Sequence, residues 1–135
     1  MKIIIDTNLW ISFLIGKKLS IMKTLFTNTE IQIYICDELM TEFNFVASRP
    51  KIRKYITDED IRETYLLMEK YCYFFPVQKK AISPVRDKND LYLLSFADTV
   101  SADFIITGDK DLLSLQFHNQ TKILTYKEFS EINLD

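Results

Sequence analysis

Short runs of apolar, mostly β-branched residues alternate with helical patterns along the chain. The first run, residues 2–5, shows no polar alternation, as expected for a strand that is covered on both faces of a parallel sheet. Similar signals predict further strands at residues 31–36, 71–77, 103–107 and 122–125. Because helical segments separate these strands, the sequence predicts a three-layer α/β domain with a mainly parallel sheet of four to five strands.

Capping residues mark where several helices begin. Asp37 is placed to cap a helix that ends before Pro50, and Thr57 with Asp60 forms a capping box for the next helix. Asp90 opens a later helix that is apolar nearly all round, which indicates a central, buried position.

The composition suits one compact globular domain. The chain has 135 residues, of which 47% are hydrophobic, and this is ample material for one core. It contains two glycines, so no glycine-rich loop can close backbone amides around a phosphate. We therefore expect a single domain over residues 1–135 and exclude P-loop and dinucleotide-binding folds.

Charge and cysteine content limit the partners and the compartment. The net charge is −2, so a polyanion would have to be held by a local basic patch or through metal ions. Cys36 and Cys72 lie in apolar runs and are expected to be buried free thiols, which fits a reducing, cytoplasmic setting. His118 lies in a polar stretch and is expected to be solvated, without a role. No segment approaches the length of a membrane span.

Acidic residues follow two of the predicted strands, where the sites of open α/β sheets lie. Asp6 directly follows the first strand, and Asp109 follows residues 104–107 across Gly108, which can take a tight turn. Asp90, at the start of the buried helix, can lie near the same edge. Each has a simpler interpretation, because Asp6 and Asp90 could be helix N-caps and Asp109 a turn residue.

Glu42 is the most informative single residue. With Leu39, Phe43 and Val46 it forms one helix face, so a carboxylate occupies a core position. A partly buried carboxylate needs a cation, a hydrogen-bond donor or a proton, and a basic residue distant in sequence could supply this. If the three aspartates converge on Glu42, a divalent metal would neutralise the group, and oxygen-only ligands select Mg²⁺ or Mn²⁺.

Such an acidic pocket suits phosphodiester cleavage. A bound metal polarises the phosphate, stabilises the leaving oxygen and generates hydroxide from water, so no protein nucleophile is needed. Thr107 could hydrogen-bond the attacking water or a metal-bound carboxylate, and Asn8 could fix the orientation of Asp6.

Four short motifs, taken in order, resemble the PIN-domain family. They are IDTN at residues 5–8, a helix carrying Glu42, RDKND at residues 86–90 and ITGDKDLL at residues 106–113. The resemblance implies a quartet of catalytic, metal-binding carboxylates, namely Asp6, Glu42, Asp90 and Asp109. Asp111 lies on the same turn as Asp109; it could supply the fourth carboxylate instead, or support the ligands from behind.

The same resemblance implies a function. It implies an Mg²⁺- or Mn²⁺-dependent endoribonuclease acting on single-stranded RNA, the toxin half of a prokaryotic toxin–antitoxin pair. The implied partners are the RNA substrate, a cognate antitoxin protein and a second copy in a homodimer, with no membrane. Related sequences often carry an acidic pair where this chain has Asn89-Asp90, so the local negative charge is lower by one.

Other functions compete with this one. A phosphatase of the haloacid-dehalogenase type also places Asp after its first strand, but it needs a second acid two residues on, where this chain has Asn8. The serious alternative is a PIN-like module that binds RNA or a partner without cutting it.

Overall fold

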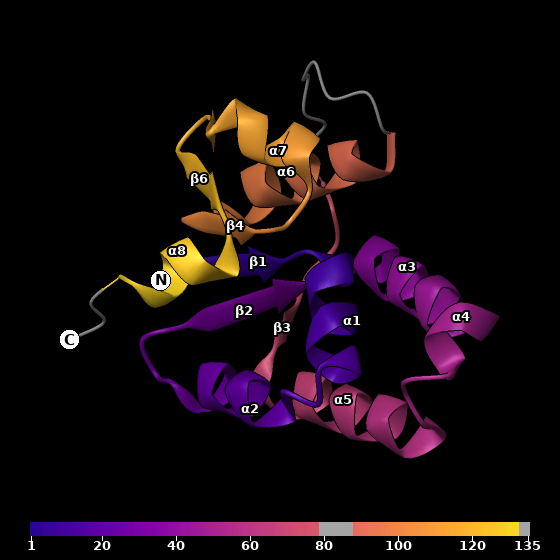
Figure 1. The fold of residues 1–135 in the computed structure, drawn as a ribbon. Helices are drawn as coiled ribbons and strands as arrows, with labels where there is room; N and C mark the ends of the chain where they lie inside the picture. The colour runs from indigo at the N-terminus through magenta and orange to yellow at the C-terminus, as the bar shows by residue number, and fades with distance from the viewer. Residues whose placement is uncertain (79–87, 133–135) are drawn as a thin grey trace.

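The structure is a computed structural model that describes residues 1–78 and 88–132. Within these ranges, six strands form one sheet in the order β3-β2-β1-β4-β6-β5 (Figure 1). The strands are β1 (Lys2–Ile5), β2 (Gln32–Ile35), β3 (Tyr73–Phe74), β4 (Phe104–Ile106), β5 (Phe117–His118) and β6 (Thr121–Leu124). All pairings are parallel except that of β5 with β6. The mainly parallel sheet is confirmed, with one strand more than expected.

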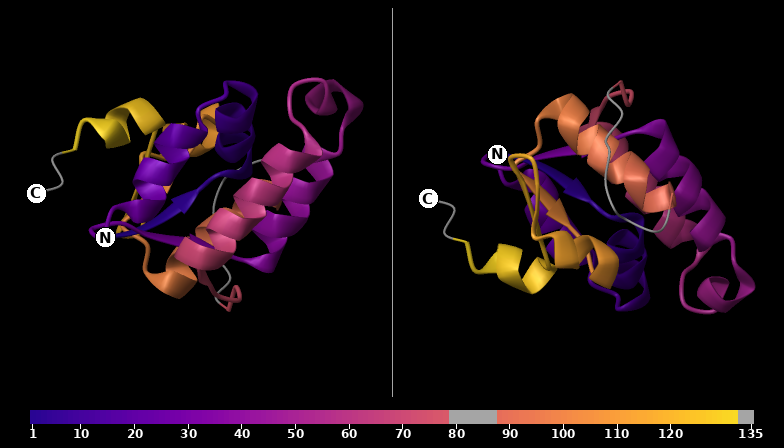
Figure 2. Two further views of the ribbon diagram at one scale, coloured as in Figure 1. Left: turned by 90° about the horizontal axis from the view of Figure 1, so that it is seen from below. Right: turned by 90° about the horizontal axis from the view of Figure 1, so that it is seen from above.

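Helices cover both faces of this sheet, which confirms the three-layer arrangement. Figure 2 shows α6 and α7 on opposite sides of the strands. The helices are α1 (Thr7–Ile15), α2 (Leu19–Thr27), α3 (Asp37–Ala47), α4 (Pro50–Arg53), α5 (Asp58–Tyr71), α6 (Lys88–Val100), α7 (Lys110–Leu115) and α8 (Tyr126–Ser130). In the described parts of the chain, none is long and apolar enough to cross a membrane.

The core is built around the central strand β1. Its residues Ile3, Ile4 and Ile5 are at most 1% exposed, because β2 and β4 pair with both of its edges and helices cover both of its faces. This explains why the run has no polar alternation. Trp10 of α1 is fully buried, and its indole N–H donates to the carbonyl of Ile5 at 3.0 Å. The end of β1 is thereby fixed to the first turns of α1.

The local helix signals agree with the structure at several points. Thr57 and Asp60 form the reciprocal capping box that begins α5. Helix α3 begins at Asp37, with Cys36 rather than Asp37 at the N-cap position. Helix α6 begins at Lys88, so Asp90 lies in its first turn, and the helix packs against β1 and β4. The predicted central position of this helix is therefore confirmed.

The expectation that His118 is solvated was wrong. Its side chain is 10% exposed, and Nε2 lies 2.9 Å from Oδ2 of Asp98 on α6. The side-chain amide of Asn119 donates to the other oxygen of Asp98 at 2.8 Å. Asn119 has a φ of 52°, a conformation that Asn tolerates, and the resulting tight β5–β6 hairpin turns the imidazole back onto α6.

Both cysteines are free thiols, as expected. Cys36 is buried and Cys72 is half-buried. Burial raises the pKa of each thiol to about 12, so both stay protonated near neutral pH.

Candidate functional site

The carboxyl ends of β1 and β4 lie side by side. Ile5 is opposite Ile106 in the parallel register, and the amide N–H of Asp6 donates to the carbonyl of Ile106 at 3.0 Å. The residue that follows β4 is Thr107, whose hydroxyl donates to Oδ2 of Asp6 at 2.7 Å. The first predicted carboxylate is therefore held in one orientation, and only 3% of the residue is exposed.

The simpler interpretation of Asp6 as a helix cap accounts for its position but not for its burial. The residue occupies the N-cap position of α1, but its carboxylate makes no capping hydrogen bond. Burial raises the pKa of Asp6, the Thr107 hydroxyl and the nearby amide of Asn8 lower it, and the charge of Asp109 raises it again. In the described residues, no Lys or Arg forms an ion pair with Asp6. The charge of Asp6 is therefore offset by hydrogen-bond donors and not by a basic side chain, and a bound cation would stabilise it further.

Asp109 combines a capping role with a contribution to this negative site. It is the N-cap of α7, and its Oδ1 accepts from the amides of Asp111 at 2.8 Å and Leu112 at 3.4 Å. Its own amide donates to the Thr107 hydroxyl at 3.0 Å. The hydroxyl of Thr107 thus connects Asp6 with Asp109. Of the two candidates for the fourth carboxylate, Asp109 is the one whose charge acts on Asp6.

Glu42 approaches the same region from α3. It is half-buried on a helix face whose neighbours Leu39 and Phe43 are fully buried. The hydroxyl of Tyr92, on α6, lies close to it: burial raises the pKa of Tyr92, and the Glu42 carboxylate raises it further, with a smaller contribution from Asp6. The charges of Glu42 on α3 and of Asp6 after β1 thus act on the same hydroxyl of α6.

Two buried hydroxyl groups at this junction were not foreseen from the sequence. The side chain of Thr7 lowers the pKa of the Tyr92 hydroxyl. Within the described residues, however, neither Oγ1 of Thr7 nor the hydroxyl of Tyr92 makes a hydrogen bond of normal geometry. A buried hydroxyl without a partner is costly. The signal was Tyr92 itself, whose hydroxyl lies among the apolar residues 91–94.

The structure links two of the four predicted carboxylates, Asp6 and Asp109, through the hydroxyl of Thr107. Asp90 is half-buried in the first turn of α6, and residues 86 and 87 of its motif lie outside the described residues. Within the ranges that the structure describes, no three His, Cys, Asp or Glu side chains lie close enough together to hold a metal ion. The charge of Asp109 acts on Asp6, and the charges of Glu42 and Asp6 both act on Tyr92.

A hollow of about 280 Å³ opens beside this site. Its lining comes from the first two turns of α1 and from the turn after β4, and consists of Asn8, Leu9, Ser12, Gly108 and Asp109. Gly108, which can take a tight turn, does not adopt a positive φ here. The side chain of Asn8 is exposed on this hollow, while its backbone amide is the group that affects Asp6.

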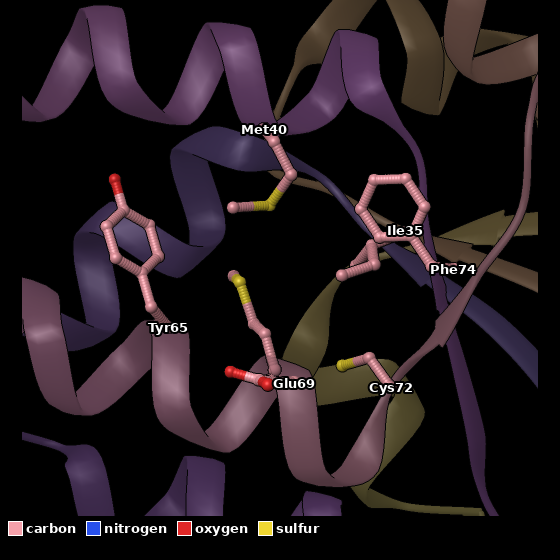
Figure 3. A pocket seen from close by; sticks show the side chains of 7 residues that line it. Ile35, Met40, Tyr65, Glu69, Cys72 and Phe74 are labelled. Atoms are coloured by element: carbon pink, nitrogen blue, oxygen red, sulfur yellow. The ribbon is translucent and has the colours of Figure 1, made fainter.

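A larger hollow, of about 440 Å³, lies elsewhere, between β2, α3, α5 and β3. Figure 3 shows Met40 on the α3 side and Tyr65, Glu69 and Cys72 on the α5 side. The lining is mainly apolar and includes no basic residue. This hollow therefore offers nothing that would hold a phosphate. The region of Asp6 and Asp109, at the carboxyl ends of β1 and β4, remains the better candidate for the site.

Comparison with known proteins identifies the family. A family model of the PIN domain matches residues 2–111. An uncharacterised protein of Methanocaldococcus jannaschii, MJ1680, is 32% identical, and the match covers 97% of this chain and 90% of that protein. The chain belongs to the PIN domain family, which confirms the resemblance of the sequence motifs.

Two solved structures share the fold. One is VapBC2 from Rickettsia felis bound to a DNA fragment from its promoter, with a TM-score of 0.59 and 15% identity over 91% of this chain and 97% of that chain. The other is the RRP44 PIN domain of T. brucei, with a TM-score of 0.52 and 15% identity over 95% of this chain and 78% of that chain. At this identity, the two structures support the fold.

Proposed function

We propose that this chain is a divalent-metal-dependent endoribonuclease that hydrolyses phosphodiester bonds in single-stranded RNA. PIN domains are generally metal-dependent nucleases. The observation that carries the proposal is the buried Asp6 carboxylate, which lies next to Asp109 and forms no ion pair with any described basic residue. Two neighbouring carboxylates repel each other when both are charged, and a cation bound between them would offset this cost.

The donor atoms at this edge fit a hard divalent cation, because they are oxygens. Asp6, Glu42, Asp90 and Asp109 would hold Mg²⁺ or Mn²⁺. When bound, the metal would polarise the phosphate and supply a hydroxide nucleophile from water. Thr107 would keep Asp6 and Asp109 in register with each other. Asn8 and Asp111 would support the ligands through the backbone amides that face Asp6 and Asp109.

We further propose that the chain is the toxin of a toxin–antitoxin pair, acting in the cytoplasm as a homodimer and blocked by a cognate antitoxin. The similarity of the fold to VapBC2 supports this assignment. A small neighbouring open reading frame with a DNA-binding half would support it too. Co-expression of that neighbour should then restore growth to cells that the chain alone inhibits.

The alternative is a PIN-like module that binds RNA or a partner without cutting. One observation favours it, namely that the described carboxylates do not form a group of three that is ready to hold a metal.

Cleavage of labelled single-stranded RNA by the purified protein separates the two functions. We expect cleavage with Mg²⁺ or Mn²⁺, loss of cleavage in excess EDTA, and recovery when metal is restored. Glu42→Gln should slow cleavage by about 10²–10³-fold, since one charge-stabilising group is lost. Cleavage that persists in EDTA or in the variant would contradict the proposal. RNA binding without cleavage would favour the alternative.

Thr107→Val tests the hydroxyl that connects the two aspartates. The substitution removes the donor to Asp6 and the acceptor for the amide of Asp109, so we expect cleavage to fall about 10–100-fold. Thr107→Ser keeps the hydroxyl and should retain most of the activity. Rates and urea midpoints measured for both variants would separate loss of positioning from loss of folding, and equal rates for Val and Ser would argue against the role.

A further inference from the structure

The hollow beside Asp109 is open to solvent and borders the proposed cleavage site. Asn8 and Ser12 are both exposed and lie four residues apart on α1, so they share one helix face. Across from them, Gly108 and Asp109 continue directly from Thr107, which holds Asp6. A group seated in the hollow would therefore lie next to the carboxylates.

Gly108 is a glycine that the fold does not require. Its φ is not positive, and a Cβ added to it would meet no atom within 4 Å. Gly16, the other glycine, differs because its Cβ would lie 3.3 Å from the carbonyl of Ser12. At a position with ordinary φ and free space, a residue with a side chain stabilises the folded state through the entropy of the unfolded chain. Because Gly108 has no side chain, the space of the hollow stays open.

The lining defines what could occupy this space. Asn8 and Ser12 offer donors and acceptors, Asp109 offers an acceptor and Leu9 an apolar wall. None of the five lining residues is aromatic, so they form no stacking platform for a base, and none is basic, so they form no clamp for a phosphate. The volume of about 280 Å³ is just below that of typical small-molecule pockets, roughly 300–1,000 Å³. This combination suits one compact unit rich in hydroxyl groups.

We propose that the hollow holds the ribose of the nucleotide adjoining the scissile phosphate and selects RNA over DNA through its 2′-hydroxyl. That hydroxyl is both donor and acceptor and is the group by which proteins tell RNA from DNA. Asn8 and Ser12 are the side chains that can bond it. The inference rests on the proposed nuclease function for its substrate, but it can be tested by binding alone.

The binding test uses the full chain with Asp6→Asn, so that the probe is not cut, in Mg²⁺ buffer. Hexauridylate and its deoxyribose equivalent are titrated while the amide resonances of Gly108 and Gly16 are followed by NMR. We expect Gly108 to shift and Gly16 to stay, with the ribose form bound about 5–10-fold more tightly, as one or two neutral hydrogen bonds allow. Ser12→Ala should remove most of this preference. Ser20→Ala, an exposed serine on α2, is the matched control.

The cleavage test uses the series Gly108→Ala, Gly108→Val and Gly108→Leu, which fills the hollow step by step. We expect melting temperatures equal to or above that of the wild type, and a kcat/KM for RNA that falls progressively, mainly through KM. A Gly108→Leu variant that cuts RNA normally would overturn the inference while leaving the nuclease function intact. Equal binding of both hexamers would overturn it too. Ribose-selective binding at Gly108 without any cleavage would leave the hollow assigned and the nuclease function refuted.

Discussion

Asp6→Asn is expected to abolish cleavage and, at the same time, to stabilise the metal-free protein at neutral pH. The activity should fall by at least about 10²–10³-fold, because a charged ligand is replaced by a neutral one. The melting temperature should rise by about 3–6 °C, the shift that ~1 kcal/mol produces in a chain of this length. A residue that serves only the fold would show the opposite change in stability.

The gain in stability follows from the direction of the Asp6 pKa shift. Burial raises the folded-state pKa above the ordinary value of 3.8, so the folded chain binds this proton more tightly than the unfolded chain does. The stability that the proton contributes is fully present below the unfolded-state value and is lost as the pH rises through the higher folded-state value. The gain in stability of Asp6→Asn over the wild type should therefore be largest at pH 7 and vanish as the pH falls to about 4.

Metal addition provides the second arm of this experiment. Mn²⁺ at about 100 times its Kd should stabilise the wild type by ~2.7 kcal/mol and the Asp6→Asn variant by much less. Glu30→Gln, at an exposed turn, is the control. It should change the stability by less than ~0.5 kcal/mol and leave the response to metal unchanged. Thermal melts at several pH values, with and without metal, measure all of this. A large fall in the melting temperature of Asp6→Asn at pH 7 would show that Asp6 is a structural residue.

The parts of this protein that could be predicted from the sequence depend on short-range signals. Asp6 directly follows the strand at residues 2–5 in the chain. The rule that sites lie at the carboxyl ends of strands then predicts that Asp6 belongs to the site. Glu42 was identified because its helix face is otherwise apolar. Each of these inferences needed one segment and one physical rule.

The parts that could not be predicted depend on contacts between distant segments. The pairing of His118 with Asp98 requires the β5–β6 hairpin to fold back onto α6, and two residues of strand leave almost no periodic signal. The convergence of Thr7 and Tyr92 depends on how α6 packs against β1. The sequence shows that Gly108 can take a tight turn, but the hollow beside it depends on how α1 packs next to the end of β4.

Trp10→Ala should have the largest effect on stability of any single substitution near the site. The side chain is fully buried, and its ring centroid lies 5.4 Å from that of Phe26. Removing a buried Trp costs about 3–5 kcal/mol, a large part of the 5–15 kcal/mol that typically stabilises a domain. We expect a protein that is partly unfolded at 37 °C, measured by urea denaturation and circular dichroism. Leu66→Ala, at a side chain that is 59% exposed, should change the stability by less than ~0.5 kcal/mol.

Trp10→Phe separates the packing of this residue from its hydrogen bond to the site. Phe retains an aromatic ring in the core but loses the indole N–H that donates to the carbonyl of Ile5, the residue before Asp6. A buried carbonyl left without this donor costs about 1–3 kcal/mol. Because that carbonyl fixes the backbone from which the Asp6 carboxylate projects, cleavage should fall even at temperatures where the variant is fully folded. A folded Trp10→Phe variant with the wild-type rate would show that Thr107 alone is sufficient to orient Asp6.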